Sequence, residues 1–157
     1  MKKPIFKTMT ERESRALLRR QYVGRIAFTF QDRVDIEPIG YVLKGGWLYG
    51  RTSRGQKLIQ LKHNPWVAFE VDEIDGAFDW RSVVAHGTVY FLNPEGEEHP
   101  DFGRAVSLFK KLDPRTLDES DPAPDRTIFF RIHLDRLSGR VATTKTRRRP
   151  TSRRRGG

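Results

Sequence analysis

The chain contains no cysteine, so disulfide bonds, thiolate metal ligands and cysteine nucleophiles are all excluded. It also lacks any run of about 18–20 apolar residues, the length that a membrane-spanning helix needs. The basic start of the chain, from Met1 to Lys7, is not followed by the apolar segment of a secretion signal. We therefore expect a soluble, cytoplasmic protein without membrane contacts.

The usual catalytic and nucleotide-binding signatures are missing as well. The chain has no Gly-x-Gly-x-x-Gly motif, no Walker-type phosphate loop and no Gly-x-Ser-x-Gly elbow. Its histidines do not have the spacing of metal ligands; they are His63, His86, His99 and His133. No metal site is therefore expected, and the catalytic residues, if there are any, are unknown from sequence.

Acidic residues are absent from the C-terminal end of the chain. Of the 30 Lys and Arg residues, eight lie between Arg140 and Gly157, where there is no Asp or Glu. Residues 1–139 then hold 22 basic and 20 acidic residues, so the net charge of +10 belongs mostly to this tail. Clustered arginines attract nucleic acid weakly and without sequence preference, but no aromatic residue is interleaved with them. Over residues 142–157 we expect a disordered basic tail rather than a functional nucleic-acid contact.

The apolar residues that are present come in short, dense segments. The hydrophobic fraction is 36% and the mean hydropathy is -0.66, both low for a folded protein. Segments such as Val83-Val84-Ala85 and Ile128-Phe129-Phe130 are nevertheless typical of half-buried strands. A length of 157 residues fits one compact domain.

The pattern predicts six strands, over residues 24–30, 34–43, 47–49, 66–71, 80–92 and 127–134. Helices are predicted over residues 10–21, 54–63 and 101–112, the first because Thr10-Glu11-Arg12-Glu13 has the form of a capping box. The acidic segments 72–76 and 113–125 are expected to be loops, the second one exposed. Pro38 cannot donate a ladder hydrogen bond, so it should lie at a bulge or an edge. Short turns between the strands favour an antiparallel barrel with helices packed outside it.

One segment, from Trp47 to Leu58, has the composition of an anion site. A strand ends there, hydroxyls and Gly55 form a turn, and a helix begins with free N–H groups beside Arg54 and Lys57. Taken alone, the segment is more typical of an ordinary capped helix with solvated cations. A second segment places the polar pair Arg81-Ser82 in an apolar strand that Gly87 interrupts. Taken alone, it also fits an edge strand with a bulge.

Together and in this order, the segments resemble the flavin-binding split-barrel superfamily, which contains pyridoxamine 5'-phosphate oxidase and the nitroimidazole-resistance proteins. The motifs that carry the resemblance are Gly24-Arg25-Ile26-Ala27, Ile36-Glu37-Pro38-Ile39, Tyr49-Gly50-Arg51-Thr52-Ser53, Gly55-Gln56-Lys57, Asn64-Pro65 and Arg81-Ser82-Val83-Val84 with Gly87. The resemblance implies a mostly β fold, a six-stranded antiparallel split β-barrel with short flanking helices. That domain would cover residues 10–141, after an N-terminal extension of residues 1–9.

The resemblance also implies a cofactor site for FMN. By analogy with the family, Thr52, Ser53 and Lys57 would contact the phosphate, and Arg51 or Arg54 would add positive charge. The family places the cofactor between the two subunits of a homodimer, so dimerisation would be part of the site.

Other motif positions would lie along the flavin ring or its polar edge. The backbone of Pro38, Ile39, Tyr49 and Gly50 would lie along the ring. The segment Arg81, Ser82 and Val83 would contact the ring or its polar edge.

The resemblance makes an FMN-dependent oxidoreductase acting on a small molecule the leading hypothesis. Arg51 stands where nitroimidazole-resistance relatives usually have histidine, and the Trp- and Arg-rich substrate segment of the oxidases is replaced by the basic tail. Pyridoxamine phosphate is therefore not the expected substrate. Two alternatives stay open: a reductase that uses the deazaflavin F420 in the same groove, and a non-catalytic protein that binds flavin or haem.

Overall fold

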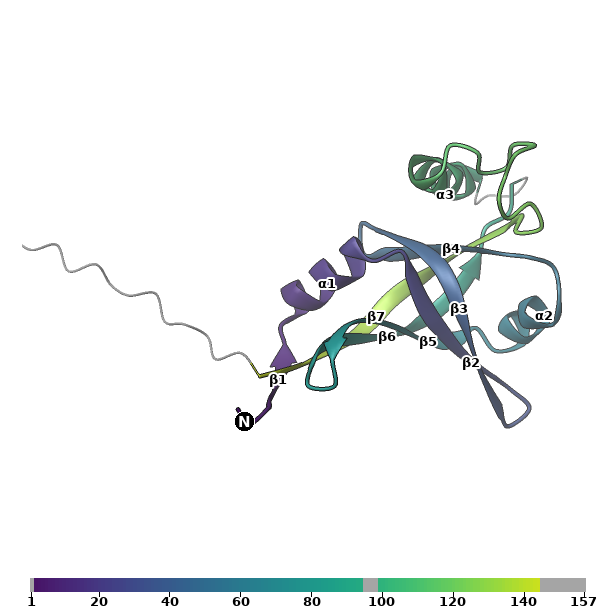
Figure 1. Ribbon diagram of the computed structural model, residues 1–157. Helices are drawn as coiled ribbons and strands as arrows, with labels where there is room; N and C mark the ends of the chain where they lie inside the picture. The colour runs from purple at the N-terminus through teal and green to yellow at the C-terminus, as the bar shows by residue number, and fades with distance from the viewer. Residues whose placement is uncertain (1, 95–98, 145–157) are drawn as a thin grey trace, which may run out of the picture.

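The structure, a computed structural model, describes residues 2–94 and 99–144, and the predicted tail falls largely outside them. Within these residues the fold is mostly β with three helices at the periphery, as the sequence predicted (Figure 1). The elements in chain order are β1 (Ile5–Met9), α1 (Glu11–Arg20), β2 (Val23–Phe30), β3 (Arg33–Lys44), β4 (Trp47–Thr52), α2 (Gln56–His63), β5 (Trp66–Gly76), β6 (Asp79–Phe91), α3 (His99–Leu112) and β7 (Ile128–Thr143).

All paired strands are antiparallel, and six of them form a closed ring. The order in the sheet is β1-β7-β4-β3-β2-β5-β6, and β6 also pairs with β7. The expected six-stranded antiparallel barrel is therefore confirmed for β2 to β7. The segment expected to be an N-terminal extension adds a seventh strand, because β1 pairs with the end of β7, from Ile5 opposite Thr143 to Met9 opposite Gly139.

Side chains that alternate along the strands fill the interior of the barrel. Ile26 of β2 and Phe69 of β5 are fully buried there, together with Leu17 and Leu18 of α1. The predicted capping box starts α1. The hydroxyl of Tyr41 donates a hydrogen bond of 2.6 Å to the backbone carbonyl of Leu18, which ties α1 to β3. Burial raises the pKa of Tyr41 above its ordinary value.

Two sequence predictions about β5 and β7 were wrong. Residues 72–76 are part of β5 rather than a loop; their acidic side chains can stay at the surface because none of these five positions is buried. Strand β7 runs on to Thr143 instead of ending at residue 134, with Arg136 and Arg140 on exposed positions. Charged residues thus interrupted the alternation of apolar and polar residues in both places.

Gly87 marks a close approach, but to protein rather than to a ligand. A Cβ at this position would clash with the backbone carbonyl of His133 in β7. The pairing of β6 with β7 shifts between His86 and Gly87, which confirms the bulge. Strand β6 is not an edge strand, because it pairs with β5 on its other side.

No helix within residues 2–94 and 99–144 has the length and apolar character needed to cross a membrane.

Candidate functional site

Strands β3 and β4 separate at one end of the sheet. Their pairing ends with Tyr41 opposite Gly50. Beyond that point β4 follows β7, so that Thr52 lies opposite Ile128, whereas β3 stays paired with β2. Pro38 lies in the unpaired stretch of β3, where the strand has a neighbour on one side only, and the prediction of an edge position is confirmed.

A hollow of about 340 Å³ lies at this separation, between β3, β4 and the start of α2. Its lining contains six of the eleven predicted cofactor-binding residues: Pro38, Ile39, Arg51, Thr52, Ser53 and Lys57. The other lining residues are Glu37, Gly55 and Arg126.

Hydroxyl, N–H and ammonium groups meet in this hollow. Thr52 is buried at the end of β4, and Ser53 follows it. Helix α2 begins after Gly55, and no side chain caps its first N–H groups. The Lys57 side chain is 18% exposed, and its Nζ atom lies 2.5 Å from Oε2 of Glu37. These donors and the positive end of a helix are groups that bind phosphate.

Arg51 points its guanidinium at a buried carboxylate instead of solvent. Its Nη1 and Nη2 atoms donate to the two carboxylate oxygens of Asp121 at 2.7 and 2.8 Å. The two side chains are 10% and 1% exposed. The hydrogen bonds from Arg51 hold the pKa of Asp121 far below its usual range. The charge of Arg51 is therefore already balanced inside the protein.

The loop that carries Asp121 is packed more tightly than its sequence predicted. The backbone N–H groups of Leu117 and Ala123 also donate to the Asp121 carboxylate, at 2.7 and 2.8 Å. Thr116 is buried too, and its hydroxyl donates to the carbonyl of Asp113 at 2.8 Å. The prediction of a wholly exposed loop was wrong, because its polar residues fold inward onto each other and onto Arg51.

Tyr49 and Gly50 have structural surroundings of their own and do not line the hollow. The Tyr49 side chain is buried with Phe129 in a second apolar cluster beneath α3. A Cβ at Gly50 would clash with the ring of Phe130, so the packing of β7 requires glycine there. Arg54, the other cation considered for the phosphate, is exposed and also lies outside the lining.

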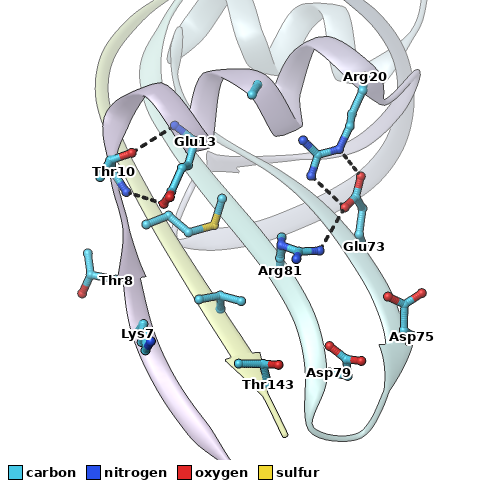
Figure 2. Close-up of a pocket in the computed structure, with 13 residues that line it drawn as sticks. Lys7, Thr8, Thr10, Glu13, Arg20, Glu73, Asp75, Asp79, Arg81 and Thr143 are labelled. Atoms are coloured by element: carbon cyan, nitrogen blue, oxygen red, sulfur yellow. Dashed lines mark hydrogen bonds and ion pairs between the residues drawn. The ribbon is translucent and has the colours of Figure 1, made fainter. Parts of the chain in front are cut away.

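The predicted residues of β6 lie elsewhere in this chain. Val83 is buried in the main core. The Ser82 hydroxyl donates to Oε1 of Glu70 at 2.8 Å. Arg81 lines a different, larger hollow of about 940 Å³ that is bordered by α1, β1, the β5–β6 hairpin and the end of β7 (Figure 2). Arg81, Ser82 and Val83 are thus not brought together with Thr52, Ser53 and Lys57 within one chain.

Charges in the larger hollow largely balance one another. Glu73 accepts hydrogen bonds from Arg20 at 2.5 and 2.8 Å and from Gln21 at 2.7 Å, and Arg81 lies 3.8 Å from it (Figure 2). The hydrogen bond from Arg20 is the main reason that the pKa of Glu73 is lowered. The hollow at α2, with its uncapped N–H groups, is the better anion site.

Three residues of the site were not assigned from sequence: Glu37, Asp121 and Arg126. Glu37 belongs to a motif that carried the resemblance, but its carboxylate gave no reason to place it beside Lys57. Asp121 precedes Pro122 and accepts from the N–H of Ala123 two residues on, a turn that sequence can indicate. Its partner Arg51 is 70 residues away, and no local pattern could supply that pairing.

Within residues 2–94 and 99–144, no group of three or more His, Asp or Glu residues could hold a metal ion.

An antiparallel ring of strands with peripheral helices, in which β3 and β4 separate at one end, defines a split β-barrel protein. A family model described as pyridoxamine 5'-phosphate oxidase matches residues 10–141. The chain belongs to this family.

Relatives with the same fold come from several bacteria. A solved FAD-binding protein from Mesorhizobium loti is 27% identical, with a TM-score of 0.74 over 88% of this chain and 99% of that one. An FAD-binding protein from Mycobacterium smegmatis is 24% identical, with a TM-score of 0.61 over 87% of this chain and 99% of that one. An uncharacterized protein from Rhizobium meliloti (strain 1021) is 28% identical over 146 residues, which are 87% of this chain and 95% of that protein.

Proposed function

We propose that the chain binds FMN at the hollow between β3 and β4 and acts as a flavin-dependent oxidoreductase on a small molecule. The observation that carries the proposal is the meeting of Thr52, Ser53 and Lys57 with the uncapped start of α2. The match to the pyridoxamine 5'-phosphate oxidase family supports it. The similarity to an FAD-binding protein also favours a flavin over an unrelated phosphate compound.

In this proposal the phosphate lies against Thr52, Ser53 and Lys57, and the flavin ring extends along the backbone of Pro38 and Ile39. The bound flavin supplies the redox chemistry. The protein residues hold the phosphate, fix the ring against β3 and supply its electrostatic surroundings. Arg51 is committed to Asp121, so its part is to position the loop rather than to donate a proton.

A second copy of the chain is proposed to complete the site. Val34 and Ile36 lie on β3 next to Pro38 and are 73% and 65% exposed, respectively, which leaves an apolar strip beside the hollow. Apolar surface of this kind is usually covered by a partner. In a homodimer, Arg81 and Ser82 would serve the hollow of the opposite copy, which would reconcile their predicted role with their distance from Thr52 in one chain.

The visible spectrum of the purified protein tests this function, together with mass spectrometry of the ligand released on denaturation. We expect a flavin spectrum and the mass of FMN. The band of a deazaflavin or a haem would favour one of the alternative cofactors instead. Reduction of the bound cofactor by NADH or NADPH, followed by reoxidation with candidate acceptors, separates an oxidoreductase from a non-catalytic carrier. Failure of added FMN to bind at all would overturn the proposal.

A further inference from the structure

The basic residues of the hollow differ in how far their charges are already balanced. Arg51 is paired with Asp121, and Lys57 with Glu37. Arg126 lines the same hollow, is exposed, and forms no ion pair with any carboxylate in the part of the chain that the structure describes. We propose that Arg126 is a further phosphate-binding residue of this site, an inference that rests on the proposed flavin function.

The backbone of Arg126 is held in place beside the hollow. Its N–H donates to the carbonyl of Ala123 at 3.1 Å. Its own carbonyl accepts from Nη1 of Arg51 at 3.4 Å. Two residues later Ile128 starts β7 and pairs with Thr52. Arg126 is therefore anchored next to the hydroxyl-bearing end of β4, and Arg51 is the link between them.

The charges that line the hollow explain why Arg126 would be needed to bind a phosphate. With Arg51 and Asp121 cancelling, and Lys57 and Glu37 cancelling, Arg126 supplies the excess positive charge. A phosphate monoester carries a charge of about −1.5 to −2 at pH 7, which Lys57 alone would have to neutralise in competition with Glu37. A guanidinium can also hold two phosphate oxygens with two parallel N–H groups of one planar fork, a geometry that an ammonium does not have.

The size of the hollow fits a phosphate with part of its attached chain. Its volume is about 340 Å³, far above the roughly 10–15 Å³ that a single water molecule needs on a comparable measure. Arg126 and the donors at the start of α2 line this same hollow, so we expect both to meet one bound phosphate.

The test compares FMN with riboflavin, which has the same ring but no phosphate. Dissociation constants are measured by fluorescence titration of the apoprotein for the wild type, Arg126→Ala, Arg126→Lys and Arg12→Ala. Arg12 is an exposed arginine of α1, outside the lining of the hollow, so Arg12→Ala removes the same charge elsewhere. Because a charge-assisted hydrogen bond is lost, Arg126→Ala should weaken FMN binding about 10- to 100-fold. Riboflavin binding should be unchanged, Arg126→Lys should lie between, and Arg12→Ala should match the wild type.

Other results would contradict the phosphate contact of Arg126, the proposed flavin function, or both. If Arg126→Ala weakens riboflavin as much as FMN, the residue supports the fold and does not contact phosphate. If it leaves FMN binding unchanged while Lys57→Ala weakens it, the inference is wrong and the proposed function stands. If the wild type binds neither flavin, both are wrong.

Discussion

Replacing Asp121 by alanine should destabilise the protein by about 3 kcal/mol. The change leaves the guanidinium of Arg51, only 10% exposed, without its carboxylate, and it removes the acceptor of the Leu117 and Ala123 N–H groups. Breaking a buried ion pair by removing one partner costs about 3–5 kcal/mol. We take the lower end of this range because Arg51 also lines the hollow, where water can reach it. Thermal unfolding followed by circular dichroism should show a fall in Tm of about 6–12 °C.

The matched control is Asp118→Ala in the same loop. The Asp118 side chain is 58% exposed and lies 3.7 Å from Nζ of Lys110. Exposed pairs of this kind are worth about 0–1 kcal/mol, so this variant should unfold close to the wild-type temperature. If Asp121→Ala lowers Tm no more than Asp118→Ala does, the ion pair with Arg51 does not stabilise the fold as argued.

A double-mutant cycle separates the pair from the other bonds of Asp121. Arg51→Met leaves the Asp121 carboxylate with two backbone donors, so its loss of stability should be smaller than that of Asp121→Ala. The double variant should lose less stability than the two single changes added together, because the pair is then removed only once. Strict additivity would mean that Arg51 and Asp121 do not interact energetically.

The pH dependence gives a further check on the same pair. Hydrogen bonds from Arg51 lower the pKa of Asp121 in the folded state, whereas an unfolded aspartate titrates near about 3.9. Stability from this group is therefore fully present above about pH 4 to 5 and is lost as the pH falls toward the folded pKa. Denaturant unfolding should show a constant gap between wild type and Asp121→Ala from pH 7 to 5, and a narrowing gap below pH 4.

Three other expectations test the site, the assembly and the tail. Lys57→Ala should weaken FMN binding about 10- to 100-fold without a change in Tm of the apoprotein; an unchanged dissociation constant would remove Lys57 from the site. Light scattering should give twice the chain mass of 18.3 kDa, and Ile36→Glu should produce monomers with little bound flavin; a wild-type monomer that binds FMN tightly would contradict the dimer. Deleting residues 147–157 should leave Tm and flavin occupancy unchanged and abolish any weak DNA binding; a loss of flavin would show that the arginines reach the cofactor.

The sequence predicted most of the fold because helix caps, turns and strand alternation depend on residues that are close together in the chain. The capping box at Thr10 and Glu13 forms as expected, and Asn64-Pro65 ends α2. Alternation located strands wherever one face is apolar and the other polar. It failed at the end of β7, where Arg136, Ser138 and Arg140 interrupt the apolar residues and only pairing with β6 and β1 defines the strand.

The site was predicted in part for the same reason. Thr52, Ser53 and Lys57 lie within six residues of one another, so a turn followed by a helix is enough to bring them together. The positions of Asp121 and Arg126 depend on a loop that returns over the sheet after α3. In the proposed homodimer, Arg81 would reach the flavin of a second copy, and no pattern within one strand can predict that.

The separation of β3 from β4 connects the stability of the fold with the affinity of the proposed site. Strand β4 leaves β3 after Gly50 because it continues along β7, and the next side chain, Arg51, turns to meet Asp121. The same guanidinium holds the carbonyl of Arg126. One ion pair thus closes the loop over the sheet and sets the place of Arg126, the arginine of the hollow that forms no ion pair with a described carboxylate. A substitution in this pair therefore acts on the fold first and on the anion site through it, whereas a substitution of Arg126 acts on the anion site alone.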